Sequence, residues 1–104
     1  SNASNLFVTV AQAATDAGVL PKSIYYHLNR SKKLNVINDG YGLKVLKSEL
    51  KGVYPGTKGG VKQKQLINSK DSALHQITAL IMERAEEGDI KSVESLVFSA
   101  RNIK

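Results

Sequence analysis

The fold is decided by residues 8–50, which read VTVAQAATDAGVLPKSIYYHLNRSKKLNVINDGYGLKVLKSEL. Thr9 stands three residues before Gln12. This is the spacing of a capping box, in which the Thr hydroxyl and the Gln amide each bond a free backbone N–H. Apolar residues then recur at helical spacing as far as Ala17, and Gly18 suits the left-handed conformation that ends a helix. The pattern predicts a short helix between Thr9 and Gly18.

A second helix is predicted over residues 21–30, because Pro21 is well tolerated at the first position of a helix. Ile24 and Leu28 are four residues apart and should face the core. The opposite face carries donor-rich side chains that can reach base edges or phosphates. These candidate recognition residues are Lys22, Ser23, Tyr26, Asn29 and Arg30, together with His27, which is either partly buried or faces the nucleic acid.

Residues 34–46 predict a β-hairpin, because Asp39-Gly40 stands between two β-prone runs. Two basic residues precede the hairpin, and polar residues fall at or near its tip. The candidate nucleic-acid contacts in this region are Lys32, Lys33, Asn38, Tyr41 and Lys44.

The order of these parts resembles the winged helix-turn-helix shared by the mercury-resistance-regulator (MerR) superfamily and phage excisionases. In that pattern a Thr-Val-x-x-Ala-Ala helix leads to Gly-Val, then to a helix with a hydroxyl residue before Ile-Tyr, and then to a wing. The resemblance covers residues 8–50. The matching positions are Thr9, Val10, Ala13, Ala14, Gly18, Val19, Ser23, Ile24 and Tyr25.

The chain departs from the family pattern at two places. The family often has an aromatic residue where His27 stands, and a Gly-Lys-Leu start to the wing where this chain has Ser31-Lys32-Lys33-Leu34. The resemblance implies that residues 21–30 enter the major groove of DNA. It also implies that the wing, residues 34–46, contacts the adjacent minor groove or backbone.

The charge of the chain is unevenly distributed. The 104 residues carry a formal net charge of +6. Residues 1–70 hold 11 Lys or Arg and 3 Asp or Glu, whereas residues 71–104 hold 4 and 6, so the two parts carry +8 and −2. The basic part contains the predicted recognition helix, and this agrees with a polyanionic partner.

Residues 52–70 are predicted to be a basic, Gly-rich linker. Gly52, Pro55 and Gly56 are expected to break any regular element. This segment is either a plain solvated linker or an arm that follows the DNA. Its candidate DNA contacts are Lys58, Lys62 and Lys64.

Residues 71–104 predict a helical hairpin, in which Gly88 ends one helix and Asp89 caps the next. One apolar stripe comprises Leu74, Ile77, Ile81 and Ala85, broadened by Ala73, Leu80 and Met82. The other comprises Ile90, Val93, Leu96, Val97 and Ala100. Helices with such wide apolar faces must pack either on a second copy or on the preceding domain. We expect a homodimer formed through residues 71–104, with packing inside the chain as the alternative.

Several classes of function find little support in the sequence. There is no Cys, and the two His have no nucleophile, base or metal-ligand partner at a motif spacing. We therefore expect no enzyme activity and no metal or other cofactor. The C-terminal hairpin is too short to resemble a ligand-sensing domain, so we expect no small-molecule effector. No apolar run approaches the length of a membrane span. We expect no membrane partner and a cytoplasmic location, in a bacterium or a phage-infected cell.

The expected fold class is mainly α with a small β-hairpin wing: a winged helix-turn-helix over residues 4–51, followed by the C-terminal helical hairpin. Residues 1–3 resemble an expression-vector scar. No Met follows them, and we expect the chain to begin inside a longer native protein. The leading hypothesis is sequence-specific binding of double-stranded DNA by a small transcription regulator or excisionase-like factor from a phage or mobile element. The alternatives are the DNA-targeting domain of a larger replication initiator or terminase small subunit, and a protein-interaction module on a winged scaffold.

Overall fold

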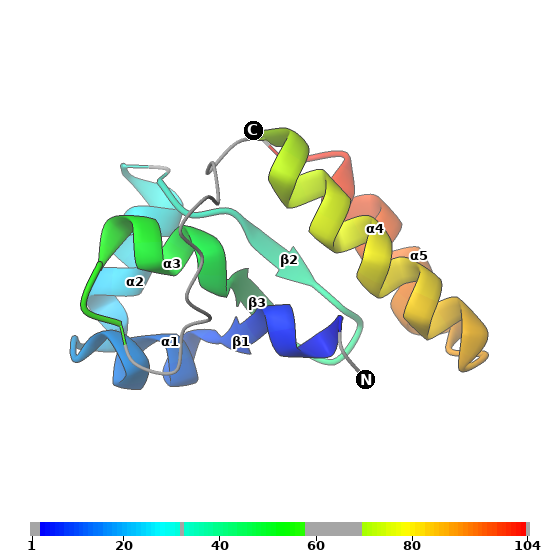
Figure 1. Cartoon of the computed structure of the whole chain (residues 1–104), viewed down its shortest axis with the longest axis horizontal. Helices are drawn as coiled ribbons and strands as arrows, with labels where there is room; N and C mark the ends of the chain where they lie inside the picture. The colour runs from blue at the N-terminus through cyan, green and yellow to red at the C-terminus, as the bar shows by residue number, and fades with distance from the viewer. Residues whose placement is uncertain (1–2, 32, 58–69, 104) are drawn as a thin grey trace.

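The structure, a computed structural model, describes residues 3–31, 33–57 and 70–103. It is mainly helical with a small antiparallel sheet (Figure 1). The elements, in chain order, are a 3₁₀ turn η1 (Ser4–Leu6), β1 (Phe7–Thr9), α1 (Val10–Ala17), α2 (Pro21–Asn29), β2 (Val36–Asn38), β3 (Leu43–Leu46), α3 (Lys47–Val53), α4 (Lys70–Glu86) and α5 (Ile90–Ala100).

The local signals at the ends of the first two helices are largely confirmed. Thr9 Oγ1 accepts a hydrogen bond of 3.0 Å from the Gln12 backbone N–H, and Gly18 ends α1 with a φ of 71°. The second half of the expected capping box is wrong, because the Gln12 amide donates instead to Asp16 Oδ1 at 2.7 Å. Pro21 is the first residue of α2, as its fixed φ favours.

The three strands lie in the order β1-β3-β2, and both pairs are antiparallel. The hairpin predicted around Asp39 is confirmed and forms the β2–β3 pair. The strand β1 was not predicted from the sequence, since it is only three residues long and its pairing with β3 is non-local. It places Phe7 opposite Leu46 and Val8 opposite Val45.

The sheet separates two hydrophobic clusters, because successive residues of a strand point to opposite faces. Val8 and Val45 pack with residues of α1, α2 and α3, among them Ala13 and Ile24. On the other face lie Phe7, Ile37 and Leu46, which pack with residues of α4 and α5: Ala73, Ile77, Leu80, Leu96 and Ile103. The side of α4 that carries Ile77 and the side of α5 that carries Leu96 are therefore buried inside the same chain, and packing of this kind was the alternative to the expected dimer.

Several details after residue 50 differ from the sequence expectation. In α4, Met82 and Ala85, which were assigned to the apolar stripe, are exposed. The buried arc of α5 consists of Ser92, Leu96 and Ser99, whereas Ile90 and Val97, which were assigned to the inward stripe, are exposed. Gly52 does not interrupt regular structure, because it lies within α3. One Gly in a helix costs only about 1 kcal/mol, which the packing of the neighbouring Leu50 outweighs.

The segment between α2 and β2 is held by the side chain of Glu49 in α3. Its two carboxylate oxygens accept hydrogen bonds from the Asn35 backbone N–H at 2.7 Å and from Asn35 Nδ2 at 2.8 Å. Burial raises the pKa of Glu49, and these two hydrogen bonds oppose that rise. Glu49 and the buried Leu34 thus fix the residues that follow α2.

The turn between β2 and β3 approaches α5 closely at Gly40, in a backbone conformation that also favours Gly. A Cβ there would lie 3.2 Å from the Ser92 Cα, and the φ of Gly40 is 90°. We expect Gly40→Ala to lower the free energy of unfolding by about 2–4 kcal/mol, because it adds a backbone clash to a left-handed conformation. Urea denaturation measures the difference.

Gly18→Ala is the matched control, because Gly18 has a φ of 71° and its Cβ would meet nothing within 4 Å. This variant should lose only the strain of the left-handed conformation, about 1–2 kcal/mol. Equal losses of unfolding free energy for the two variants would contradict a tight contact between Gly40 and α5.

Candidate nucleic-acid interface

The helix α2 has one buried and one exposed face. Ile24 is fully buried in the cluster beneath the helix, and Leu28 packs against the same cluster. Four of the predicted recognition residues lie on the exposed face: Lys22, Tyr26, Asn29 and Arg30. Ser23 and His27 are half-buried at its edge. The structure therefore brings these six side chains together on one helix, as their spacing predicts.

Tyr54 joins this surface from the residue that follows α3. The ring of His27 contacts the rings of Tyr26 and Tyr54 edge to face, with both centroid distances at 5.4 Å. His27 Nδ1 lies 2.9 Å from Ser31 Oγ. Sequence reasoning assigned Tyr54 to a linker and missed this contact. The only sequence signal was an aromatic residue directly after an amphipathic run.

These side chains border a shallow, open hollow beside α2. Its volume is about 370 Å³, and it is lined by Lys22, Ser23, Tyr26, His27 and Tyr54. The rings hold one wall in place through their edge-to-face contacts. The hollow therefore combines a cation, a hydroxyl and aromatic edges on a supported surface.

Three cations in or after α2 have no carboxylate partner among the described residues. In the ranges that the structure describes, the ion pairs all involve Asp39 or Arg84, and none involves Lys22, Arg30 or Lys33. Arg30 and Lys33 are exposed. Lys32 and the three predicted linker contacts, Lys58, Lys62 and Lys64, lie outside the described residues.

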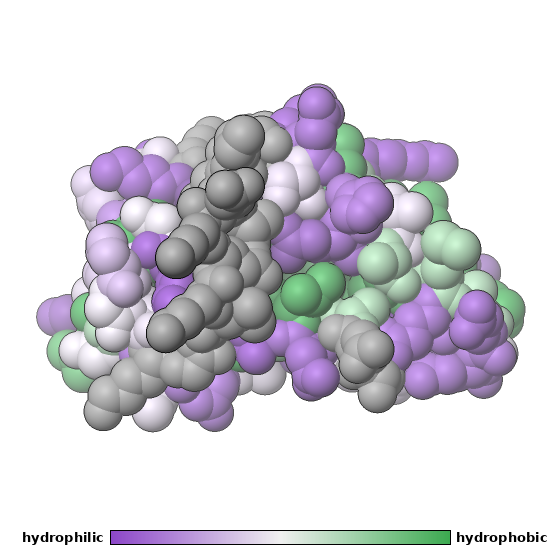
Figure 2. All heavy atoms as spheres, viewed as in Figure 1, coloured by the Kyte–Doolittle hydropathy of each residue, from purple (hydrophilic) through white to green (hydrophobic). Residues whose placement is uncertain are grey.

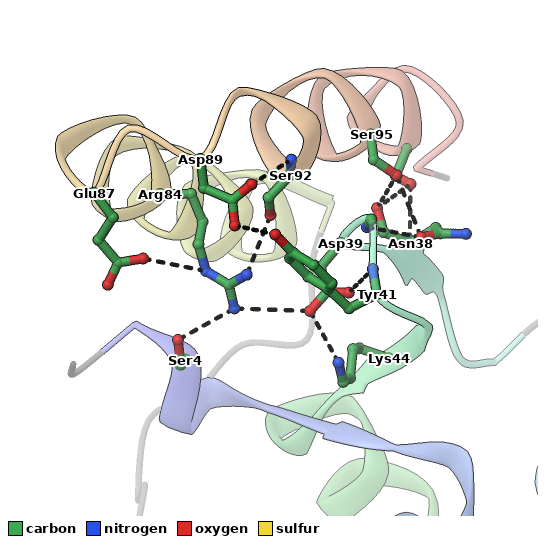
Figure 3. Close-up of polar contacts among 12 residues, drawn as sticks. Ser4, Asn38, Asp39, Tyr41, Lys44, Arg84, Glu87, Asp89, Ser92 and Ser95 are labelled. Atoms are coloured by element: carbon green, nitrogen blue, oxygen red, sulfur yellow. Dashed lines mark hydrogen bonds and ion pairs between the residues drawn. The ribbon is translucent and has the colours of Figure 1, made fainter.

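The hairpin turn, in contrast, is already engaged within the chain (Figure 3). The Asn38 backbone N–H donates to Ser99 Oγ at 2.9 Å, and Ser95 Oγ donates to the Asn38 carbonyl at 2.7 Å. The Tyr41 hydroxyl donates to Asp89 Oδ2 at 2.6 Å. Two of the predicted wing-tip contacts thus bond residues in α5 or at its cap.

Asp39 is the buried centre of this network, with 3% of the residue exposed. It accepts hydrogen bonds from Lys44 Nζ and from the Tyr41 backbone N–H, each at 2.9 Å. Arg84 Nη2 of α4 lies 3.7 Å from the same carboxylate. Burial opposes ionisation of Asp39, but these hydrogen bonds and the two positive charges outweigh it and lower its pKa.

Arg84 extends the network to α5, to η1 and to the turn that follows α4. Its guanidinium donates to Ser92 Oγ at 3.2 Å and to Ser4 Oγ at 3.4 Å, and it lies 3.9 Å from Glu87. Lys44, which was predicted to contact DNA, is bound to Asp39. Figure 1 shows α4 and α5 at the opposite end of the molecule from α2. The structure therefore holds the turn of the predicted wing against the C-terminal helices and does not bring it to the exposed face of α2.

Comparisons of the chain with protein-family models, with curated proteins and with solved structures found no match. Among residues 3–31, 33–57 and 70–103, no three His, Asp or Glu side chains lie close enough together to hold a metal ion. None of the helices described there is both long and apolar enough to cross a bilayer.

Replacing Asp39 by Asn should lower the free energy of unfolding by about 2–3 kcal/mol at neutral pH, because Lys44 and Arg84 would then face a neutral amide. The pKa of Asp39 is lowered in the folded state from its ordinary value of 3.8. The contribution of Asp39 to the free energy of unfolding is therefore complete above pH 3.8, and it is lost as the pH falls through the lower pKa of the folded state. The difference between wild type and variant should shrink on acidification. Denaturant titrations at several pH values measure it.

The exposed Glu86→Gln variant is the control, since it removes a carboxylate from α4 outside this network. It should change stability by less than about 0.5 kcal/mol. Two results would contradict the role assigned to Asp39: equal stability of Asp39→Asn and wild type at neutral pH, or a stability difference that stays the same in acid.

Proposed function

We propose that this chain binds double-stranded DNA through the exposed face of α2, with α1, the turn at Gly18 and α2 acting as a helix-turn-helix. The observation that carries the proposal is the set of exposed donors on this one face, of which the cations have no ion-pair partner among the described residues: Lys22, Tyr26, Asn29 and Arg30. Such an arrangement is not needed for stability, because the helix is anchored by its other face through Ile24.

The chemistry of the exposed face suits a duplex groove. A helix of 9 residues is about 14 Å long, and the major groove is about 12 Å wide and admits a helix. Arg30 can bond two acceptors of a guanine, and Asn29 can bond the paired donor and acceptor of an adenine. Lys22, in the first turn of α2, and Lys33, beyond its last turn, would bond phosphates.

The distribution of charge supports the same surface. The +8 net charge of residues 1–70 lies in the part that contains α2. The side chains of Asn38, Tyr41 and Lys44 are bonded within the chain, so we do not include them in the proposed contact surface. The winged helix-turn-helix resemblance then applies to the helices more closely than to the contacts of the wing.

The biological role that fits this proposal is a sequence-specific transcription regulator or an excisionase-like factor. The same surface would serve the DNA-targeting domain of a larger initiator or terminase. A protein-interaction module is the second candidate, favoured by the apolar side chains exposed on α5. Salt separates the two, because binding to phosphates weakens steeply as salt rises whereas apolar docking does not.

Arg30→Ala should weaken binding to a selected DNA site by about fivefold to 150-fold, because a bidentate base contact contributes about 1–3 kcal/mol. Fluorescence anisotropy with a duplex selected from a random pool measures the affinity. The control is Lys70→Ala, which removes an exposed cation from the start of α4 and should change affinity less than threefold. Equal effects of the two variants would contradict a recognition role for α2.

Lys22→Ala tests a phosphate contact on the same face. We expect it to weaken binding to selected and random duplexes alike and to reduce the slope of log K against log salt by about one unit. The same anisotropy titration, repeated over a series of salt concentrations, gives the slope. A loss of affinity confined to the selected duplex would contradict the phosphate assignment.

A further inference from the structure

The solvent-facing side of α5 carries an apolar pair between two opposite charges. Val97 is 39% exposed and Phe98 is 67% exposed. Glu94 and Arg101 are also exposed. The four residues fall at positions i, i+3, i+4 and i+7, so they form one continuous stripe along the helix. We call them the α5 stripe.

Nothing described in the chain covers the α5 stripe. The buried arc of α5, which contains Leu96, faces the sheet and α4 instead. Figure 2 shows further hydrophobic residues (green) among hydrophilic ones (purple) on the α4–α5 half of the molecule. An exposed Phe beside an exposed Val on a folded helix leaves apolar area in water that a partner could bury.

The two charges of the stripe lack a partner within the described residues, where the ion pairs lie around Arg84 and Asp39. They cannot pair with each other, because seven residues along a helix separate them by about 10.5 Å. In the order Glu-x-x-Val-Phe-x-x-Arg, each apolar residue is equally far from the midpoint, and so is each charge, but the two charges are opposite. Read from either end, it gives a charge, two apolar residues and the opposite charge.

We propose that the α5 stripe is the contact surface of a homodimer, in which α5 packs antiparallel against α5 of a second copy. With the two-fold axis between Val97 and Phe98, Val97 faces Phe98 of the second copy. Glu94 then faces Arg101 of the second copy, and symmetry repeats both contacts. A second copy supplies an opposite charge to both Glu94 and Arg101. This charge complementarity is the reason for choosing a second copy as the partner that covers the stripe.

The size of the stripe sets the strength of the dimer. It spans two helical turns, so the interface lies at or below the small end of specific interfaces, which is about 1,200 Å². We therefore expect an equilibrium between monomer and dimer that depends on concentration. The pairing does not rest on DNA binding, because α2 lies at the other end of the molecule and remains open in both copies (Figure 1).

Sedimentation velocity over a wide range of protein concentration tests the proposal. The wild type should shift from monomer to dimer as concentration rises. Phe98→Asp should weaken association by more than about a hundredfold, because the substitution removes the apolar contact twice in each dimer. The control Met82→Asp alters another exposed apolar residue, 61% exposed on α4, and should leave association unchanged. Circular dichroism establishes that both variants are folded.

A charge exchange tests the register of the pairing. Glu94→Arg and Arg101→Glu should each weaken association by roughly tenfold, because like charges then face each other twice. The double variant should restore wild-type association, since the two charges have simply changed places. A wild type that stays monomeric would overturn the proposal and leave the stripe to a different protein. A dimer that survives Phe98→Asp, or a double variant that is not restored, would also overturn it.

Discussion

The structure depends on a three-stranded sheet that must be covered on both faces. The strands are only three or four residues long, and their side chains alternate between two apolar clusters. Val45 packs in the cluster under α1 and α2, whereas its neighbour Leu46 packs in the cluster under α4 and α5. Such a small sheet cannot remain folded with one face in water, because each buried side chain contributes about 1.5–3 kcal/mol. The helical hairpin is therefore part of the core, although the chain between the two halves is basic and rich in Gly.

This constraint explains how the two ends of the molecule differ. Covering the second face brings α5 against the β2–β3 turn, where Gly40 allows the close approach and Asp39 gathers Lys44 and Arg84. The polar side chains at that end form hydrogen bonds and ion pairs within the chain. At the other end α2 needs only Ile24 and Leu28 to hold it, so its remaining face keeps cations and amides that nothing described in the chain binds. The open face of α2 and the bonded β2–β3 turn are thus two consequences of the same packing.

Structural features that depend only on neighbouring residues could be predicted from the sequence. Thr9, Gly18 and Asp89 end or begin helices where their side chains and conformations predict, and the exposed face of α2 follows from spacing alone. Features that depend on distant partners could not be read in this way. Ser92 and Ser99 are buried because Arg84 and Asn38 supply their hydrogen bonds, so polarity placed Leu96 on the buried face of α5 correctly but added the exposed Ile90 and Val97. Tyr54 reaches the candidate site only because α3 folds back toward α2, and no nearby residue signals that contact.

The most direct test of the account is a map of amide chemical shifts in the ¹⁵N-labelled protein during titration with a selected DNA duplex. We predict that the shifts concentrate at Lys22, Tyr26, Asn29 and Arg30, while the amides of the α5 stripe respond to protein concentration and not to DNA. Shifts that centre on the β2–β3 turn or on α5, with α2 unchanged, would contradict the central claim that α2 is the DNA-contacting surface.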